Sequence, residues 1–524
     1  MTTHTLDHHP DDTQHRNGLP PARPVSALIV GTGFGGLGAA VALRQAGISD
    51  ITVVEKAGRV GGVWRENTYP GAACDVPSSL YSWSFAPNPE WPRRFAEQPD
   101  ILRYIESTAA DLGLLELVEF HTEVTSAHWD DTTGRWHVEG VRGETSVSWD
   151  VDVLVCAVGQ LSRPAMPRIE GTERFAGPAF HSATWDHGVD LRGKRVGVIG
   201  TGASAIQFVP QIQPVADHVT VFQRSAPYVV PKPDRAYTRA HLEAFRRVPP
   251  TQRFGRGLTN RLSTVLNRAM TEQTRFVSVI ERYFQWWLKR EVADPELRRK
   301  LTPDYPIGCK RLLFSNDWYS TLGEPDVEVV TDPIREITAS GVVTDAGDTV
   351  REHDLDVIIY GTGFAATEFL APMTLTGRDG VGLDEVWADG AHAYLGVTVP
   401  RFPNLFIVYG PNTNLGGGSN VSMIEAQTGY IAQAVQCLAR GERSSIEVRE
   451  QVSDRYDREV QDRLQQSVWA GGCASWYQND SGRITTNWVG TVDEYKDRLE
   501  VFDLSDYVAR PATEPAYEPA VAST

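Results

Sequence analysis

A short apolar run that ends in a cluster of glycines is the first regular pattern in the chain. Residues Ser26–Val30 are mostly apolar, which predicts a buried strand. The segment Gly31-Thr32-Gly33-Phe34-Gly35-Gly36 follows at once, and Leu37–Gln45 has the spacing of a helix. A second β-branched run, Ile51–Val54, ends at Glu55. The pattern predicts a strand–helix–strand unit in which a glycine-rich turn leads into the helix.

The same arrangement returns later in the chain. Residues Arg195–Ile199 predict a strand, Gly200–Ala205 reads G-x-G-x-x-A, and Val219–Phe222 predicts the next strand after a helix-like stretch. Two such units predict an α/β fold with two Rossmann-like dinucleotide-binding domains.

Strand-like runs continue towards the C-terminus. Val327–Val330 and Val357–Tyr360 predict strands, and the second leads into a glycine turn at residues 361–364. We interpret this turn as the point where the second nucleotide domain closes and the chain re-enters the first. Leu405–Val408 predicts a further strand, and Glu425–Leu438 predicts a helix after a glycine-rich loop.

Between residues 235 and 300 the pattern changes from strands to helices. Apolar residues recur there at helical spacing: Leu262, Val265, Leu266, Phe276, Val279, Ile280, Phe284 and Trp287. This predicts a helical insertion in the second nucleotide domain. The segment carries 15 Lys/Arg against 6 Asp/Glu. We interpret the excess as a solvated helical face beside the second nucleotide site, with a membrane-surface or an acidic-substrate face as alternatives.

Composition narrows the classes of function. A chain of 524 residues is too long for a single core. Its net charge of -17 argues against nucleic acid as the main partner. No stretch is apolar enough for a transmembrane helix. The segment Met1–Arg23 is rich in His, Asp and Pro and lacks an apolar core, so we expect a disordered tail and no signal peptide.

The cysteines bear on the redox compartment. They are Cys74, Cys156, Cys309, Cys437 and Cys473, with no C-x-x-C pair. An odd count without a secretory signal favours a reducing, cytoplasmic location, and we expect each cysteine to be simply packed. The spacing also weighs against a dithiol–disulfide reductase, and no metal site is predicted.

The first glycine turn predicts a dinucleotide site. Its glycines let backbone N–H groups approach a pyrophosphate, and the helix N-terminus adds positive charge there. Glu55 follows Gly36 by 19 residues, where a carboxylate binds ribose hydroxyls. The candidate residues are Gly31, Gly33, Phe34, Gly36, Glu55 and Lys56.

The second glycine turn predicts a site for a phosphorylated nicotinamide nucleotide. Here the strand ends in Gln223-Arg224-Ser225 rather than in an acid. A cation and a hydroxyl suit a 2′-phosphate, which favours NADPH over NADH. The candidate residues are Gly200, Gly202, Ala203, Ser204, Gln207, Arg224 and Ser225.

These patterns divide the chain into segments. We expect a disordered tail at 1–24, the first nucleotide domain at 25–165 and 365–510, the second at 166–234 and 308–364, a helical insertion at 235–307, and a disordered tail at 511–524.

A motif precedes the second unit. Residues 175–186 read FAGPAFHSATWD and fit F-x-G-x-x-x-H-x-x-x-W-[P/D] through Phe175, Gly177, His181, Trp185 and Asp186. The chain therefore resembles the type I Baeyer–Villiger monooxygenases, within the flavin-containing monooxygenase superfamily.

Further segments extend the resemblance from about Val25 to Phe502. Gly61-Gly62-Val63-Trp64 resembles the segment that covers the flavin, to which Tyr81 is added as a candidate contact. Tyr69–Asp75 (YPGAACD) resembles the turn that places an Asp near the isoalloxazine. Gly308-Cys309-Lys310-Arg311 resembles the segment carrying the active-site Arg, with Lys310 reaching the 2′-phosphate.

Two more segments resemble family sequences, one of them with a single substitution. Asp356–Phe364 (DVIIYGTGF) resembles the second family signature, with Gly361 in place of the usual Ala. Ala474–Tyr477 resembles a stretch near the substrate cavity.

The resemblance implies an activity and its cofactors. The family inserts one oxygen atom of O2 next to a ketone carbonyl, giving an ester or lactone through a C4a-peroxyflavin and a Criegee intermediate. It implies FAD in the first nucleotide domain and NADPH in the second. The ketone and the oligomeric state stay open, and the helical insertion leaves peripheral membrane contact possible.

Arg311 and Asp75 are the predicted catalytic residues. A deprotonated peroxide needs a fixed positive charge, and a guanidinium stays protonated at any working pH. Its donors also stabilise an oxyanion, while Asp75 holds it in place. For His181 we predict a structural-switch role rather than acid–base chemistry, while Trp185 packs and Asp186 caps a turn.

Three alternative functions are less consistent with the sequence. An N- or S-oxygenating flavin monooxygenase has a motif ending in Tyr and lacks the Arg, so Trp185, Asp186 and Arg311 favour carbonyl oxygenation. A disulfide reductase needs a paired dithiol, and a redox-sensing flavoprotein does not need Arg311 and Asp75. The glycine-rich loop Asn414–Asn420 and the 175–186 motif are the candidates for closing the site to water.

Overall fold

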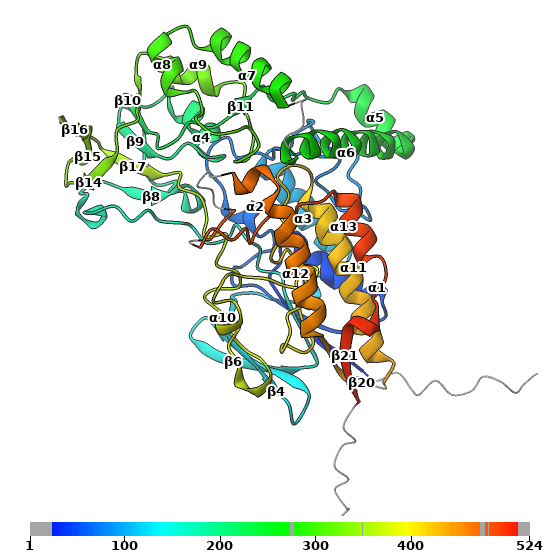
Figure 1. The fold of residues 1–524 in the computed structure, drawn as a ribbon. Helices are drawn as coiled ribbons and strands as arrows, with labels where there is room; N and C mark the ends of the chain where they lie inside the picture. Colours follow the sequence, from blue (N-terminus) through cyan, green and yellow to red (C-terminus); the bar gives the residue numbers. More distant parts are fainter. Residues whose placement is uncertain are drawn as a thin grey trace, which may run out of the picture.

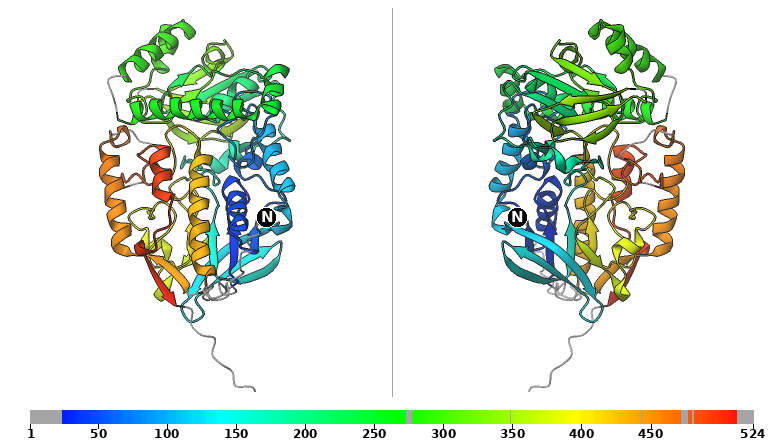
Figure 2. Two further views of the ribbon diagram at one scale, coloured as in Figure 1. Left: turned by 90° about the vertical axis from the view of Figure 1, so that its right-hand side faces the viewer. Right: turned by 90° about the vertical axis from the view of Figure 1, so that its left-hand side faces the viewer.

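The computed structural model describes residues 24–272, 277–347, 349–441, 443–471, 477–479 and 481–511. The predicted tails lie outside these residues apart from Pro24 and Pro511. Phe276, Cys473 and Ala474–Trp476 also lie outside them. Figure 1 shows two lobes stacked on each other, and Figure 2 shows them from both sides, with the green segments above the blue, yellow and orange ones.

The lower lobe is built on a five-stranded parallel sheet in the order β19-β7-β1-β2-β3. Its strands are β1 (Ser26–Val30), β2 (Asp50–Val54), β3 (Val118–Glu119), β7 (Val153–Cys156) and β19 (Leu405–Ile407). Helices α1 (Phe34–Gln45) and α11 (Asn420–Ala439) pack on each other, and their apolar faces join the same core as β1. The strands predicted at residues 26–30, 51–54 and 405–408 are therefore confirmed as members of one sheet.

Helix α1 starts earlier than the sequence pattern predicts. It begins at Phe34 rather than Leu37 and includes Gly35 and Gly36. Each glycine costs about 1 kcal/mol relative to alanine in a helix interior, so propensity argues for a later start. Packing explains the glycines, since a Cβ on Gly36 would lie 1.8 Å from the Gly31 carbonyl oxygen and one on Gly35 would lie 3.0 Å from the Val408 side chain. Glycine at position 36 therefore lets the start of the helix lie against the turn.

The upper lobe contains a second five-stranded parallel sheet in the order β13-β10-β9-β17-β8. Its strands are β8 (Ala179–His181), β9 (Arg195–Ile199), β10 (His218–Phe222), β13 (Val327–Val330) and β17 (Val357–Tyr360), covered by α4 (Ala205–Ile212) and α9 (Trp318–Leu322). Strand β8 belongs to the 175–186 motif. The motif is therefore an edge strand of this sheet and not only a linker between two domains.

Three further sheets were not predicted, one mixed (β18 runs parallel to its neighbour) and two antiparallel. The largest has the order β18-β4-β5-β6, formed by β18 (Thr374–Thr376), β4 (Thr122–Asp130), β5 (Arg135–Arg142) and β6 (Thr145–Val151). The others are β14 (Ile334–Ile337), β15 (Gly341–Asp345) and β16 (Val350–Asp354), and β20 (Arg443–Val448) with β21 (Tyr507–Pro511). Strand β4 alternates between buried and exposed residues, so a search for period-two patterns would have found it.

Residues 239–272 and 277–300 are helical apart from short breaks, as the pattern predicts. The helices are α5 (Arg239–Arg247), α6 (Pro249–Thr271), α7 (Val277–Glu291) and α8 (Pro295–Lys300). Helix α7 buries Phe284 and Leu288 in the core of the upper lobe. Helices α5 and α6 stand out to one side of the two lobes (Figure 1). Apolar residues of this segment are therefore not all core residues.

The remaining elements complete the lower lobe and the contacts between lobes. They are α2 (Val63–Glu66), α3 (Gln98–Asp111), α10 (Leu383–Val386), α12 (Glu450–Gln465), α13 (Val492–Leu499) and the short strands β11 (Val229–Val230) and β12 (Leu313–Phe314). Among the described helices, none has the length and apolar character needed to cross a membrane. The described residues also hold no group of three or more His, Cys, Asp or Glu side chains suited to a metal ion.

Candidate active site

The first glycine turn, Gly31–Gly36, has the geometry expected of a pyrophosphate site. Gly31 has a φ of 103°, and a Cβ there would lie 2.7 Å from the Ala157 carbonyl oxygen. A Cβ on Gly36 would lie 1.8 Å from the Gly31 carbonyl oxygen. No side chain caps the start of α1 at Gly33. The turn therefore requires glycine and leaves the helix N-terminus open to an anion.

Glu55 ends strand β2 beside this turn. The carboxylate is buried and accepts hydrogen bonds from the Thr32 backbone N–H at 3.1 Å and the Thr32 hydroxyl at 2.5 Å. Its other oxygen accepts from the Ala57 backbone N–H at 2.9 Å and pairs with Arg65 at 3.0 Å. Glu55 is thus fixed at the strand end, while the neighbouring Lys56 is exposed.

A group of aromatic residues lies next to the same turn. The Trp64 indole N–H donates to the Tyr81 hydroxyl at 3.1 Å, and the Phe34 and Tyr81 rings meet at 5.2 Å. Burial raises the pKa of Tyr81, so this phenol stays neutral. Gly62, with a φ of 54°, precedes Val63 at the start of α2. The structure therefore gathers the residues predicted to cover the flavin.

The second glycine turn, Gly200–Ala205, has a similar form. Gly200 has a φ of 111°, and a Cβ there would lie 2.4 Å from the Gly361 carbonyl oxygen. A Cβ on Gly202 would meet only that oxygen, at 3.9 Å, so the space above the turn is open. Ser204 precedes α4 without capping it through its side chain. The two G-x-G segments of the upper lobe, at 200–202 and 361–363, therefore lie in contact.

Three residues predicted to select NADPH lie together at the end of β10. The Lys310 ammonium donates to the Ser225 hydroxyl at 2.8 Å. Burial and the nearby Arg224 charge lower the pKa of Lys310, and its ammonium lies 4.6 Å from the Tyr305 ring centre. Arg224 is exposed. Two cations that repel each other beside a hydroxyl form a site suited to a phosphate.

Arg311 and Asp75 form an ion pair although 236 positions separate them. The Arg311 Nε donates to Asp75 Oδ2 at 2.7 Å, and its terminal nitrogen lies 2.7 Å from the same oxygen. The side chains are 23% and 26% exposed, so the pair borders open space. The Asp75 charge raises the pKa of Arg311 against the effect of burial. Arg311 therefore keeps its positive charge, and the Asp75 carboxylate fixes one side of its guanidinium.

The turn that carries Asp75 is attached to the upper lobe. Gln207 on α4 donates to the Ala73 carbonyl oxygen at 3.0 Å and accepts from the Tyr69 hydroxyl at 3.0 Å. A Cβ on Gly71, which has a φ of 79°, would lie 2.7 Å from the Gln207 carbonyl oxygen. Gln207, predicted as a cofactor contact, therefore also joins the two lobes next to the Arg311–Asp75 pair.

Sequence reasoning missed Tyr409, although it named the loop Asn414–Asn420 to which Tyr409 bonds. The Tyr409 hydroxyl donates to Asn414 at 2.7 Å and accepts from Asn420 at 2.8 Å. The positive charge of Arg311 acts on this hydroxyl and favours its ionised form. Burial raises the pKa of Tyr409 and raises that of Tyr477 to about 12, with Arg311 opposing the shift in both cases. Tyr409 has a φ of 61°, a conformation that no motif in the sequence indicates.

The 175–186 motif has a packing reason at each position. A Cβ on Gly177 would lie 2.5 Å from the Asp356 carbonyl oxygen, so only glycine fits. His181 is buried, accepts from the Ala183 backbone N–H at 3.0 Å, and has its pKa lowered mainly by burial. The Trp185 ring meets those of Phe180 and Phe208, each at 5.3 Å. Asp186 accepts from the Gly188 backbone N–H at 2.8 Å.

The motif predictions for Trp185 and Asp186 are thus confirmed as packing and turn capping. Phe175 packs beside the core cluster that contains Tyr360 of β17. One cysteine prediction is wrong. Cys74, Cys156 and Cys437 are free, but Cys309 is disulfide-bonded, so it is not simply packed.

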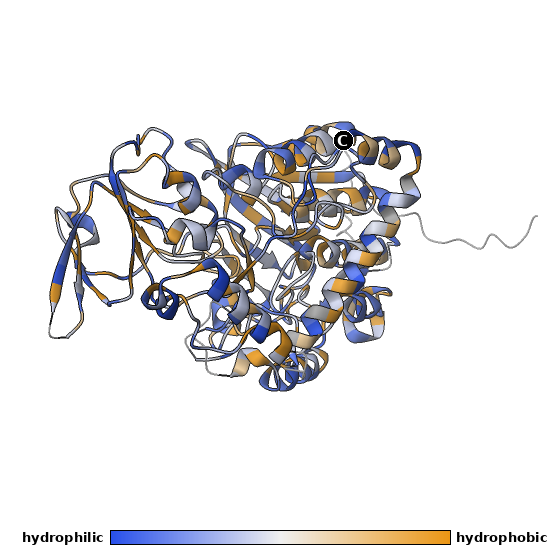
Figure 3. Ribbon diagram, turned by 90° about the horizontal axis from the view of Figure 1, so that it is seen from above, coloured by the Kyte–Doolittle hydropathy of each residue, from blue (hydrophilic) through white to orange (hydrophobic). Residues whose placement is uncertain are grey.

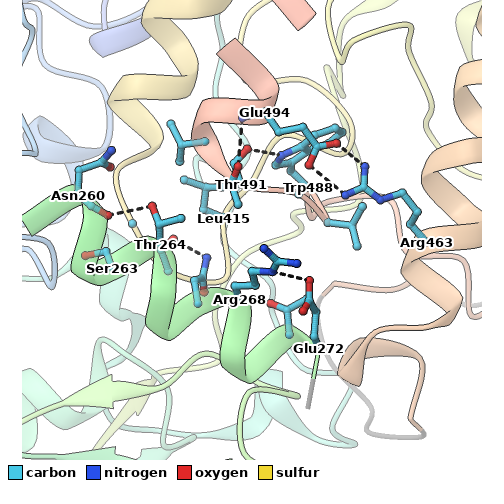
Figure 4. A pocket seen from close by; sticks show the side chains of 17 residues that line it. Asn260, Ser263, Thr264, Arg268, Glu272, Leu415, Arg463, Trp488, Thr491 and Glu494 are labelled. Atoms are coloured by element: carbon cyan, nitrogen blue, oxygen red, sulfur yellow. Dashed lines mark hydrogen bonds and ion pairs between the residues drawn. The ribbon is translucent and has the colours of Figure 1, made fainter. Parts of the chain in front are cut away.

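A separate cavity of about 230 Å³ lies between α6 and the glycine-rich loop (Figure 4). One wall is the polar face of α6, which includes Asn260, Ser263 and Thr264. The opposite wall contains Leu415, Gly417, Trp488 and Thr491. Neither Asp75 nor Arg311 lines this cavity, so it is distinct from the ion pair.

Comparisons with known proteins agree with this geometry. Residues 25–373 match the family model of flavin-binding monooxygenase-like proteins. The chain is 45% identical over 491 residues to a Baeyer–Villiger monooxygenase of Streptomyces coelicolor, covering 93% of each chain. It is 44% identical over 488 residues to a Baeyer–Villiger monooxygenase of Pseudomonas aeruginosa, covering 93% of this chain and 92% of the relative.

Solved structures give the same result. A cyclohexanone monooxygenase from Rhodococcus sp. Phi1 bound to NADP+ superimposes with a TM-score of 0.83 at 29% identity, covering 94% of this chain and all (100%) of that one. An oxidized steroid monooxygenase bound to NADP has a TM-score of 0.79 at 32% identity, covering 93% and 99%.

The two lobes are therefore Rossmann-type domains for a flavin and a nicotinamide nucleotide. The chain belongs to the flavin-binding monooxygenase family, among its Baeyer–Villiger members. It is an FAD- and NADPH-dependent enzyme that inserts one oxygen atom of O2 next to a ketone carbonyl. The comparisons favour this reaction over N- or S-oxygenation.

Proposed function

We propose that the Arg311–Asp75 pair is where the ketone is oxygenated. The observation that carries this proposal is a guanidinium whose pKa is raised by a carboxylate 2.7 Å away and whose side chain is still partly exposed. A cation that cannot lose its proton stabilises negative charge on oxygen throughout the reaction. Because Asp75 occupies one side of the guanidinium, the remaining N–H groups are available to the substrate.

We further propose which residues hold the cofactors. FAD fits the first glycine turn, where the glycine-only geometry at Gly31 and Gly36 leaves backbone N–H groups and an uncapped helix start for its pyrophosphate. NADPH fits the second turn, with its 2′-phosphate at Arg224, Ser225 and Lys310. When bound, the flavin accepts a hydride and activates O2.

The chain's own residues then act on the substrate. Arg311 donates hydrogen bonds to the carbonyl oxygen as that oxygen gains negative charge. Asp75 keeps the guanidinium in one orientation. Tyr409 stays neutral because burial raises its pKa, and its two hydrogen bonds order the loop at Asn414–Asn420. This loop and the 175–186 motif exclude water from the site.

The segment boundaries belong to the same proposal. We assign residues 25–165 and 365–510 to the FAD domain, 166–234 and 308–364 to the NADPH domain, and 235–307 to an insertion in the latter. The cytoplasmic location stays a prediction.

The proposal is tested by supplying ¹⁸O2, NADPH and a panel of cyclic, linear and aryl ketones to the wild type and to Arg311→Ala. The wild type is expected to give an ester or lactone with one labelled oxygen. The variant is expected to reduce its flavin with NADPH but to release hydrogen peroxide. Arg192→Ala is a matched control, because Arg192 is exposed and pairs only with Asp190 among the contacts seen for described residues. Equal ester yields from wild type and Arg311→Ala would refute the assigned site.

A further inference from the structure

Helix α6 has its apolar residues on the outside. Phe254, Leu258, Leu262 and Val265 are 75%, 60%, 57% and 64% exposed. Successive members lie four, four and three positions apart, so they form one stripe along the helix. We call these four residues the outer stripe. Apolar and polar residues also alternate along the helices at the margin of the molecule in Figure 3.

The inner face of the same helix is polar and makes hydrogen bonds to neighbouring segments. Gln252 donates to the Asn88 carbonyl oxygen at 2.6 Å, and Arg256 donates to the Ser79 and Ser82 carbonyl oxygens at 3.0 Å each. Asn267 donates to the Gly417 carbonyl oxygen at 2.8 Å. Asn260, Ser263 and Thr264 line the 230 Å³ cavity on this side of the helix (Figure 4). Rotating α6 to bury the outer stripe would break these bonds, so the hydrogen bonds of the inner face keep the stripe facing outward.

Positive charge accompanies the stripe. Arg261 is exposed next to Leu262. Arg268 is 66% exposed but pairs with Glu272 at 2.9 Å and lines the cavity. At the other end, Arg247 of α5 is exposed just before α6 begins and pairs with Glu243 at 2.5 Å. Residues 235–300 carry 15 Lys/Arg and 6 Asp/Glu in a chain whose net charge is -17. The segment that carries the stripe therefore has an excess of positive charge, with Arg261 directly beside the stripe.

We propose that the outer stripe of α6 docks on the surface of an anionic lipid bilayer. An apolar stripe flanked by arginines is the composition of helices that lie in the membrane interface. Apolar side chains enter the headgroup region while the arginines contact anionic headgroups. The stripe extends over about 17 Å at 1.5 Å per residue, so the helix lies along the surface rather than through it.

Charge also decides against a second copy of the chain as the occupant. A two-fold axis close to Arg261 would place this residue near its own copy in the partner. Like charges in a buried interface are destabilising, whereas an anionic membrane neutralises them.

The test uses the full-length holoenzyme and vesicles of phosphatidylcholine with or without phosphatidylglycerol. Co-sedimentation with the anionic vesicles is expected for the wild type, and about tenfold weaker partitioning for Leu258→Gln/Leu262→Gln. Val501→Gln is the matched control, because Val501 is 69% exposed on another part of the chain. Its binding is expected to equal that of the wild type. Bound FAD, read from the visible absorbance, reports that each variant is folded.

Two further measurements separate the alternatives. Arg261→Gln is expected to weaken binding to anionic vesicles, and raised salt is expected to do the same in the wild type. Equal vesicle binding by wild type and the stripe variant, or no binding by the wild type, overturns the proposal. A wild-type dimer that the stripe variant converts to a monomer in sedimentation equilibrium, without vesicle binding by either, would assign the stripe to a second copy instead.

Discussion

Arg311 of the upper lobe donates from Nε to Asp75 Oδ2 of the lower lobe at 2.7 Å. Arg311 follows Lys310, which bonds to Ser225 of the upper lobe. Asp75 lies in the turn that Gln207 of α4 holds by a hydrogen bond. The bond therefore connects these two segments. The orientation of the guanidinium thus depends on how the two lobes sit on each other. Substitutions in this region are therefore expected to separate flavin reduction from oxygen transfer.

Replacing Asp75 by asparagine tests the ion pair without changing its size. The amide still accepts a hydrogen bond but no longer raises the pKa of Arg311 or fixes its charge. Ester formation is expected to fall about a hundredfold, the loss typical of a misplaced oxyanion donor, with flavin reduction nearly unchanged. Stopped-flow absorbance of the flavin and product yield measure the two steps. A parallel loss in both would mean that Asp75 acts on flavin binding instead.

Arg224→Ala tests the choice of nucleotide. Loss of a charge-assisted contact to the 2′-phosphate is expected to raise the KM for NADPH about tenfold to a hundredfold. The KM for NADH, which lacks that phosphate, is expected to stay the same. Steady-state kinetics with both nucleotides measure this. Equal losses for both would contradict the 2′-phosphate assignment.

Lys310 predicts a pH dependence of nucleotide affinity. Burial and Arg224 lower its pKa, so the neutral amine appears at a lower pH than for an ordinary lysine at about 10.4. A bound phosphate favours the charged form, so affinity for NADP+ is full below the pKa and declines as pH rises through it. Titrations of NADP+ across this range measure the effect. Lys310→Arg is expected to remove the dependence, and NADH is expected to show none in either protein.

Gly71→Ala tests the contact between the lobes. The new Cβ would lie 2.7 Å from the Gln207 backbone oxygen and would also strain a residue at φ 79°. Gly113→Ala is the control, because Gly113 has a φ of 62° with nothing within 4 Å of its Cβ position. Backbone strain of about 1–2 kcal/mol is common to both variants. A greater loss of Tm and of ester yield is expected in Gly71→Ala than in Gly113→Ala. Equal losses would show that the contact between Gly71 and Gln207 contributes to neither stability nor activity.

His181→Ala tests the role of the 175–186 motif. The buried imidazole holds the Ala183 backbone N–H, and its lowered pKa keeps it neutral near pH 7. The variant is expected to oxidise NADPH while yielding several-fold less ester per NADPH. His187→Ala, which removes an exposed histidine that contacts Thr68, is the control. Unchanged coupling in His181→Ala would rule out the switch role.

Part of this architecture could be read from local patterns. The strands at 26–30, 195–199 and 357–360 are predictable because every residue except the first of each of the first two strands is buried, which gives a continuous apolar run. The glycine turns after them are predictable because their backbone favours glycine. The antiparallel strand Thr122–Asp130 was missed although its alternation is local. The early starts of α1 at Phe34 and α11 at Asn420 were missed because packing overrode the weak helix propensity of glycine and polar residues.

The sequence by itself determined the two nucleotide turns, the family motifs and the identity of Arg311 and Asp75 as candidates. Only the tertiary structure decided which way α6 faces, that residues 179–181 form an edge strand, and that Tyr409 joins the Arg311 region. The reason is physical. Glycine turns can be recognised locally because their backbone has positive φ values that favour glycine, as at Gly31 and Gly200. The partner of a side chain, in contrast, depends on segments that can lie hundreds of residues apart. An apolar stripe at helical spacing has the same sequence pattern whether it faces a core or a membrane.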